Sequence, residues 1–245
     1  MIGGIIFDLG NTLMYLDGDW REIEARGVAE MSDFLVKQGL ALDQACFGEA
    51  FLAHRQKGFA RASETRIEVL AADTLRASLA TFGYPNVDDA LIREALRHYF
   101  RLEEQSYVAF PDALDVLRQL DSMGYRLGMI SNATDDPLIQ RLVDRLGFRP
   151  WLNPVLSSAG VGFRKPDPRI FQIVLDEWRL LPTQVVMVGD TPEADILGAQ
   201  LAGLHSVLVN MDQSFPNTAA LNIQADAQID SLSLLPWVIS TIRWR

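Results

Sequence analysis

Little in the sequence points to secretion or to a membrane. Cys46 is the only cysteine among 245 residues, so no disulfide can form within the chain. The apolar runs are all shorter than the roughly 18 residues that a transmembrane helix needs. The N-terminal MIGGIIF has no basic segment before it and is too short for the apolar core of a signal peptide. We therefore expect a cytoplasmic protein that has no membrane partner.

Positive charge is also scarce. The chain has 22 Lys and Arg residues against 32 Asp and Glu residues, which gives a formal net charge of −10. Proteins that bind nucleic acids carry a basic patch or stripe, so this balance argues against a nucleic-acid partner. It does not exclude a small anionic substrate, because a few local cations decide whether one binds. Hydrophobic residues make up 49% of the chain, which is enough to bury a sizeable core.

The first half of the chain combines one apolar strand with a long helical region. Residues 3–8, GGIIFD, predict a buried strand that ends at a carboxylate. Residues 20 to 105 contain no convincing strand and are rich in Ala, Leu, Glu, Arg and Gln, with apolar residues at helical spacing. We expect an all-helical module there.

From residue 110 onward, predicted strands and helices alternate. This rhythm is typical of βαβ units, whose strands form a parallel sheet that is covered by helices on both faces. The predicted strands are YRLGMIS (125–131), PVLSS (154–158), QVVMVGD (184–190) and HSVLVN (205–210). The predicted helices are FPDALDVLRQLDSMG (110–124), TDDPLIQRLVDRLG (134–147), DPRIFQIVLDEWRL (167–180) and PEADILGAQLAG (192–203).

The first strand lies far from the others in sequence, but its apolar character places it inside a sheet. The simplest arrangement puts it in the same sheet as the C-terminal strands, with the helical region as an insertion. We therefore predict an α/β fold with a doubly wound parallel sheet. Residues 1–17 and 108–245 form the core domain in this prediction, and residues 18–107 form an inserted all-helical cap.

Polar side chains follow the predicted strands at the points where the strands end. Asp8 ends the first strand, Ser131 and Asn132 end the second, and Asp190 ends the strand QVVMVGD. Lys165 lies in the proline-rich loop GFRKPDP (162–168), before a helix. Open parallel sheets bind ligands beyond the carboxyl ends of their strands, so we expect these side chains to meet at one site.

The residue types at this predicted site suit phosphoryl transfer. Asp8 and Asp190, with Asp195 close behind, form a group that calls for a hard divalent cation such as Mg²⁺. An aspartate can also attack phosphorus and form an aspartyl-phosphate. Lys165 would offset the combined negative charge. The Ser131 hydroxyl and the N–H groups at the start of the following helix can donate hydrogen bonds to phosphate oxygens.

Four motifs in this order resemble those of the haloacid dehalogenase-like (HAD) hydrolase superfamily. They are FDLGNTL (7–13), ISN (130–132), RKPDP (164–168) and GDTPEAD (189–195). The helical insertion after the first motif resembles the subclass I cap of that family. The segment ADAQIDSLSLL (225–235) resembles the strand and helix with which the family commonly ends.

The resemblance implies a Rossmann-like core and a hydrolase that binds Mg²⁺. In it, Asp8 matches the nucleophile, Lys165 matches the family's lysine, and Ser131 matches the residue that binds phosphate. Asn132 and Thr12, which lie in the same motifs, and Lys165 are also expected to contact the phosphate. The expected metal ligands are Asp8, the backbone carbonyl of Gly10, and Asp190, and Asp195 is expected to support them.

The first motif departs from the family pattern at Gly10. Phosphatases of the family usually carry a second aspartate there, which protonates the leaving group and then activates water. General acid–base help of this kind is typically worth about 10² to 10⁴-fold in rate, and glycine cannot supply it. Asp17 and Asp19 are the nearest carboxylates that could replace it, although they read better as ordinary loop residues.

Three functions follow from these observations. The leading one is a Mg²⁺-dependent phosphatase of a small phosphorylated metabolite. The second is a 2-haloacid dehalogenase, which needs no metal and no leaving-group proton, but the acidic motif GDTPEAD argues against it. The third is a protein that binds phosphate and Mg²⁺ but turns over slowly, because Gly10 lacks a carboxylate.

The cap region offers one candidate for contact with the substrate. The segment HRQKGFARASETR (54–66) is rich in basic side chains, which could face the core and attract an anionic substrate or could simply lie in solvent. Within it we select Arg55 as the candidate substrate contact.

Overall fold

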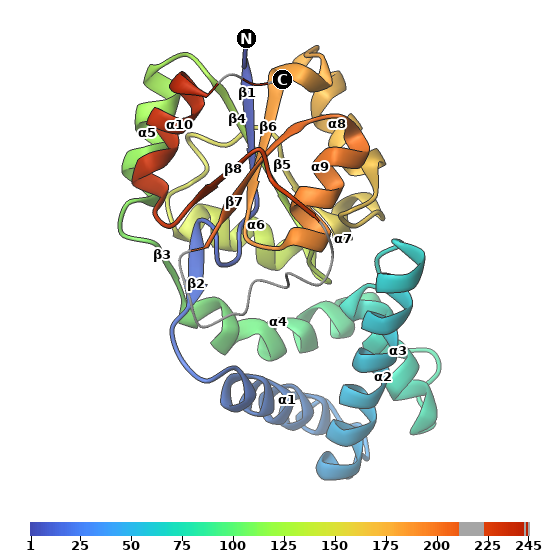
Figure 1. The fold of residues 1–245 in the computed structure, drawn as a ribbon. Coiled ribbons are helices and arrows are strands. Elements are labelled where there is room, and N and C mark those ends of the chain that lie inside the picture. The colour runs from blue at the N-terminus through green and yellow to red at the C-terminus, as the bar shows by residue number, and fades with distance from the viewer. Residues whose placement is uncertain (211–222, 243, 245) are drawn as a thin grey trace.

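The centre of the protein is a parallel sheet with the strand order β5–β4–β1–β6–β7–β8 (Figure 1). The computed structural model describes residues 1–210, 223–242 and 244. Every pair of neighbouring strands in this sheet is parallel, and β1 lies between β4 and β6. The strands are β1 (Gly4–Phe7), β4 (Arg126–Ser131), β5 (Val155–Ser157), β6 (Val185–Gly189), β7 (His205–Val209) and β8 (Ala227–Ile229). The predicted place of the first strand, inside the C-terminal sheet, is therefore confirmed.

Helices cover both faces of the sheet, as the alternation of strands and helices predicts. Successive residues of β1 point to opposite faces. Ile5 and Phe7 pack with one set of helices, and Ile6 packs with the other. The first set is α5 (Ala113–Ser122), α6 (Asp136–Arg145) and α10 (Leu235–Thr241), and the second is α8 (Pro168–Trp178) and α9 (Leu197–Ala202). In Figure 1, α5 and α10 lie on one side of the sheet, and α8 and α9 lie on the other.

The region between the first strand and the rest of the sheet is helical. Its helices are α1 (Trp20–Lys37), α2 (Gln44–Thr65), α3 (Ala71–Thr81) and α4 (Asp89–Ser106), and they lie together below the sheet in Figure 1. Three of them begin after an aspartate whose side chain accepts a hydrogen bond from a backbone N–H of the first turn, which stabilises a helix N-terminus. These residues are Asp19, Asp43 and Asp88.

Two short strands that the sequence did not predict connect the sheet region to the helical region. β2 (Met14–Leu16) pairs with β3 (Tyr107–Ala109) in an antiparallel arrangement. β2 precedes α1, and β3 follows α4, so the chain enters and leaves the helical region at one place. The predicted boundaries, at residues 17/18 and 107/108, fall at this pair.

The remaining elements are short. The predicted helix at 192–203 begins instead as a π-helical turn, η2 (Pro192–Ile196), and continues as α9. The others are α7 (Ser158–Val161) and the 3₁₀ turns η1 (Pro182–Gln184) and η3 (Leu232–Leu234). β8 and α10 match the expected closing strand and helix. Among the described residues, no helix has the length and apolar character needed to cross a membrane.

Candidate active site

The three central strands deliver polar residues to one cavity. Asp8 follows β1, Ser131 ends β4, and Asp190 follows β6. These strands are neighbours in the order β4–β1–β6, so their carboxyl ends lie side by side. All three residues line a cavity of about 440 Å³, together with Lys165 from the loop before α8. A cavity of this size suits a small ligand.

Lys165 makes the central contact of this cavity. Its Nζ donates a hydrogen bond to Asp8 Oδ1 at 2.5 Å and to the backbone carbonyl of Ile130 at 2.7 Å. The same Nζ lies 2.6 Å from Asp195 Oδ1. The side chain is almost fully buried, so water screens these charges little. The lysine therefore ties the first, third and fourth motifs together.

Burial and neighbouring charges act against each other at this pair. Burial raises the pKa of Asp8 to about 7; Lys165 opposes this shift, and Asp195 and Asp190 add to it. Burial by itself lowers the pKa of Lys165, but the charges of Asp195 and Asp8 outweigh it and raise that pKa. Lys165 is consequently charged at neutral pH. Its single positive charge does not balance the negative charges of Asp8 and the two neighbouring aspartates, Asp190 and Asp195.

Asp195 is held from two sides. One carboxylate oxygen faces Lys165, and the other accepts a hydrogen bond from the backbone N–H of Thr191 at 3.0 Å. The carboxyl group lies directly against Gly189, at a point that a Cβ on that residue would occupy. Gly189 is therefore required for this close approach. Asp195 therefore holds Lys165 in place, and its support of the metal ligands stays a prediction.

The acidic residues can hold a metal ion. One carboxylate oxygen each from Asp8, Asp190 and Asp195 lies within 4.8 Å of the others. Burial raises the pKa of Asp190 to about 6, and the charge of Asp195 adds to this shift. Two buried carboxyl groups and the half-buried Asp190 beside one lysine leave uncompensated negative charge, and carboxylate oxygens are the ligands that hard divalent cations prefer. The donor set therefore fits such a cation.

Gly10 lies on the cavity wall and leaves open space there. A Cβ built on it would meet no atom within 4 Å, and its φ is not positive. The next residue, Asn11, has a positive φ of 53°, and its Nδ2 donates a weak 3.5 Å hydrogen bond to Asp190 Oδ2. The missing carboxylate of the first motif thus leaves an unfilled part of the cavity.

Asp17 and Asp19 do not fill this space. Both are exposed, and neither lies on the cavity wall. Asp19 instead accepts hydrogen bonds from the N–H groups of Arg21 and Glu22 at the start of α1. Their interpretation as ordinary loop residues agrees with the structure, which in addition shows Asp19 as the cap of α1.

The expected phosphate contacts other than Lys165 differ in their surroundings. Ser131 lies on the wall, and its hydroxyl makes no hydrogen bond with any described residue. Asn132 also lies on the wall, but its amide exchanges two hydrogen bonds with the backbone of Lys165, at 2.8 and 2.9 Å. Thr12 is fully buried and is not part of the wall. Asn132 thus positions the Lys165 loop, and the phosphate contacts of Ser131, Asn132 and Thr12 stay predictions.

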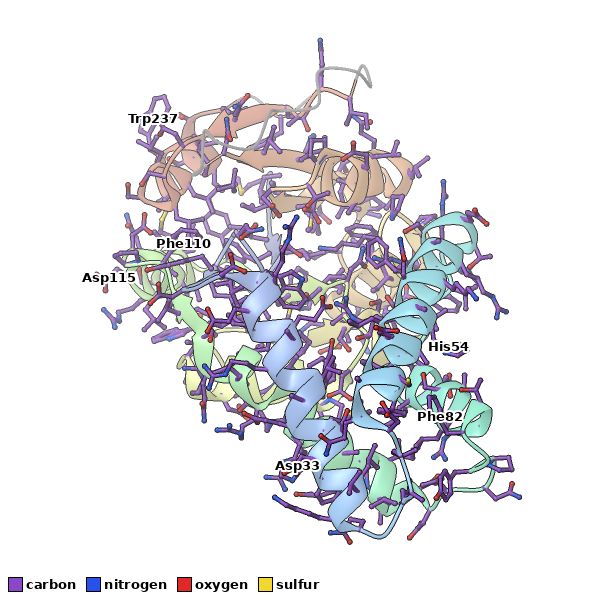
Figure 2. All side chains as sticks on the ribbon, turned by 90° about the horizontal axis from the view of Figure 1, so that it is seen from below. Asp33, His54, Phe82, Phe110, Asp115 and Trp237 are labelled. Atoms are coloured by element: carbon purple, nitrogen blue, oxygen red, sulfur yellow. The ribbon has the colours of Figure 1, made fainter. Side chains whose placement is uncertain are left out.

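Arg55 is the basic residue of segment 54–66 that reaches the cavity. It is bound within the cap: its Nη1 lies 2.5 Å from Glu24 Oε1, and its guanidinium lies 5.4 Å from the centre of the Trp20 ring. His54, by contrast, faces α3 (Figure 2), where its ring contacts Ser78 Oγ at 3.3 Å.

Sequence reasoning missed the acidic and aromatic residues that the cap and its linker add to the wall. Glu103 and Tyr107, from α4 and β3, are the principal ones. Glu103 follows the buried Tyr99 by four positions and Phe100 by three, so it lies on the buried face of α4. A carboxylate three and four positions after buried aromatic residues was the feature of the sequence that could have indicated a functional Glu103. Asp135, Arg164 and Trp20 also line the wall.

The sheet order, with a cap inserted after the first strand, is the architecture of a capped α/β hydrolase. More narrowly, the chain belongs to the haloacid dehalogenase-like hydrolases, because the model of that family matches residues 2–203. The resemblance carried by the four sequence motifs is therefore confirmed. The predicted fold class, a parallel α/β core with an inserted helical region, is confirmed as well.

Several curated relatives are named as phosphatases. The chain is 31% identical to ribulose-1,5-bisphosphate 5-phosphatase of Halopiger xanaduensis, over 98% of this chain and all of that protein. It is 37% identical to glyceraldehyde 3-phosphate phosphatase of Methanothermobacter thermautotrophicus, over 56% of this chain and 54% of that one.

Solved structures share the fold. A 2-haloacid dehalogenase from Pseudomonas syringae superposes with a TM-score of 0.70 at 24% identity, over 98% of this chain and 99% of that one. A HAD phosphatase from Thermococcus onnurineus gives a TM-score of 0.65 at 20% identity, over 99% of this chain and all of that one. Phosphatases and dehalogenases both have this fold, so the choice between these activities depends on the residues of the site.

Proposed function

We propose that this protein is a Mg²⁺-dependent phosphatase that cleaves a small phosphorylated metabolite through an aspartyl-phosphate on Asp8. The observation that carries the proposal is the buried pair of Asp8 and Lys165, with two further aspartates beside it. The acidic pair, Asp190 and Asp195, supports a metal-dependent reaction. The curated relatives, which are named as phosphatases of small metabolites, support the same reading.

The residues around Asp8 have separate roles in binding the cation and the phosphate. Asp8, Asp190 and the backbone carbonyl of Gly10 would hold the cation, and Asp195 keeps Lys165 in place. When bound, Mg²⁺ would offset the negative charge of the phosphate. Lys165 adds a fixed positive charge, and the Ser131 hydroxyl, which lies on the cavity wall, would donate to a phosphate oxygen.

The reaction takes place in two steps. First, an Asp8 carboxylate oxygen bonds to phosphorus while the bond between phosphorus and the leaving oxygen breaks, and that oxygen takes up a proton. Second, a water molecule attacks phosphorus and loses a proton, and the bond to Asp8 breaks. Inorganic phosphate and the free carboxylate result. Both steps move protons, and Gly10 supplies no group to carry them.

The open space at Gly10 favours a second candidate, a protein that binds phosphate and turns over slowly. This candidate keeps the phosphate and metal sites but lacks the group that speeds proton transfer. Tight binding of phosphate with negligible hydrolysis would favour it. A metal-independent dehalogenase is the further alternative, and the acidic pair of Asp190 and Asp195 counts against it.

A screen of phosphate release tests the proposal. Purified protein is incubated with a panel of phosphorylated metabolites and p-nitrophenyl phosphate, in Mg²⁺ or in EDTA, beside Asp8→Asn and the surface control Glu94→Gln. We expect release by the wild type and by Glu94→Gln in Mg²⁺, and loss of release in EDTA and in Asp8→Asn. No release from any ester would contradict the proposal. Chloride release from chloroacetate in EDTA would establish the dehalogenase instead.

A further inference from the structure

The cavity that contains Asp8 extends to the cap. Its wall includes Trp20, Phe59 and Phe100 from three cap helices, in addition to the strand-end residues. A phosphate bound at Asp8 would therefore direct the rest of its ester toward the cap. The side chains on the cap side of the cavity decide which alcohol part can fit there.

Carboxyl groups outnumber cations on this wall. Among the described residues that line the cavity, six are acidic and three are basic. The acidic ones are Asp8, Glu68, Glu103, Asp135, Asp190 and Asp195, and the basic ones are Arg55, Arg164 and Lys165. Even with a divalent cation bound, the acidic groups remain in excess. These carboxylates would repel a substrate that carries a second anionic group besides its phosphate.

Each basic residue of the wall already has a carboxylate partner. Arg55 Nη1 lies 2.5 Å from Glu24 Oε1, and Arg164 Nη1 lies 3.6 Å from the buried Glu68. Both guanidinium groups also lie over aromatic rings, Arg55 at 5.4 Å from Trp20 and Arg164 at 5.0 Å from Phe59. A second anionic group would have to displace one of these carboxylates, which would leave that carboxylate unpaired.

Glu103 differs from the other acidic groups of the cap side. Its carboxyl group lies on the wall and makes no hydrogen bond or ion pair with any described residue. Burial raises the pKa of Glu103 to about 7; Arg55 opposes this shift, while Glu24 and Asp135 add to it. A half-buried carboxyl group without a partner is unfavourable, and a ligand that donates a hydrogen bond to it relieves this.

We propose, on the basis of the proposed phosphatase function, that the substrate is a phosphomonoester whose only anionic group is its phosphate. Its alcohol part carries a hydroxyl or ammonium group that donates a hydrogen bond to Glu103. Glu103 is thus a residue that determines specificity. A site built to bind such a donor discriminates strongly against analogues that lack it, because its own polar group is then left unpaired.

Matched pairs of small esters test this inference. Glycerol 3-phosphate is compared with 3-phosphoglycerate, and phosphoethanolamine with phosphoglycolate, by kcat/KM in Mg²⁺. We expect the hydroxyl or the ammonium member to exceed its carboxylate partner by about tenfold or more. The two pairs show which donor, hydroxyl or ammonium, is preferred. Equal or better turnover of both carboxylate members would overturn the inference. It would indicate instead that Arg55 binds a second anionic group of the substrate.

The Glu103→Gln variant tests the residue itself, with Glu94→Gln on the same helix as control. We expect Glu103→Gln to reduce the preference within the favoured pair about tenfold. Glu94 is exposed and forms its ion pair with Arg97, so its variant should keep the full preference. An unchanged preference in Glu103→Gln would contradict the inference.

A measurement of substrate binding tests this inference independently of the proposed reaction. The affinity of the Asp8→Asn variant for the same esters is measured by isothermal titration calorimetry, which requires no turnover. If no ester is hydrolysed by the wild type, the proposed reaction fails, and the preference for uncharged or ammonium esters is still read from binding. If the carboxylate members bind as tightly as their partners, the inference fails even when the protein is an active phosphatase.

Discussion

Lys165 Nζ lies 2.5 Å from Asp8 Oδ1 and donates its hydrogen bond from a loop that is 157 positions away in sequence. The same ammonium group faces Asp195 at 2.6 Å, so one buried cation joins two buried carboxylates. Burying charges is unfavourable unless each has a partner. The pair therefore matters for folding as well as for the reaction at Asp8.

We predict that Lys165→Met is strongly destabilised. The substitution leaves Asp8 and Asp195 buried without their cation, which typically costs about 3–5 kcal/mol. Lys37→Met is the control, because Lys37 is exposed and its pair with Asp33 on α1 is worth less than about 0.5 kcal/mol. Urea unfolding in EDTA at pH 8 measures both. Equal stability of the two variants would show that the buried pair contributes nothing.

We predict that Gly10→Asp speeds phosphate release. The new side chain enters open space and the backbone conformation suits any residue, so stability should change by less than about 1 kcal/mol. The carboxyl group would supply proton transfer, and kcat should rise by about 10²-fold. Gly10→Asn, which has the same shape but no titratable group, should show no such rise. A rate equal to the wild type in Gly10→Asp would mean that another group already performs this role.

We predict that Gly189→Ala disrupts the support of Lys165. The added methyl group would overlap the Asp195 carboxyl group, so either that side chain or β6 must move. Such overpacking typically costs about 1–3 kcal/mol. Gly10→Ala is the matched control, since its methyl group meets no atom within 4 Å. Thermal unfolding and phosphate release measure the two effects, and unchanged values for Gly189→Ala would refute the close approach of Asp195.

We predict a pH-dependent gain in stability for Glu103→Gln. Burial raises the pKa of Glu103 from 4.5 to about 7 in the folded protein. The folded state therefore holds this proton more tightly than the unfolded state does. Its contribution to stability is complete below pH 4.5, falls as the pH rises to about 7, and stays low above that.

Gln has no proton to lose, so the variant lacks this decline. Relative to the wild type, Glu103→Gln should gain about 2–3 kcal/mol between pH 4.5 and pH 8 in EDTA. Urea unfolding at both pH values measures the difference, with Glu94→Gln, at an exposed position of the same helix, as the control. A difference between Glu103→Gln and the wild type that does not vary with pH would contradict the raised pKa.

The sheet could be predicted well from the sequence because the residues that define each strand lie within that strand and at its end. The apolar run of β1 ends at Asp8, and QVVMVGD ends at Asp190, so each strand carries its own boundary. Neighbouring parallel strands then place these aspartates together without further information. The pair β2 and β3 was missed because each strand has three residues and its partner lies across the whole helical region.

The cap side of the cavity could not be predicted in the same way. Arg55 was selected as a contact for an anion, but its partner Glu24 lies on α1, 31 positions earlier. Only the packing of α1 against α2 brings the two together. Asn132 likewise faces the Lys165 backbone, a contact between loops that no sequence spacing indicates.

The central claim is that Asp8 is the nucleophile of a phosphatase, and a single-turnover experiment tests it most directly. Wild-type protein is mixed with a phosphomonoester that it cleaves, quenched with acid within one turnover, digested and analysed by mass spectrometry. We predict that the peptide containing Asp8 carries a phosphoryl group, and that Asp8→Asn yields neither this adduct nor phosphate. Release of phosphate by Asp8→Asn, or an adduct on another residue, would contradict the account.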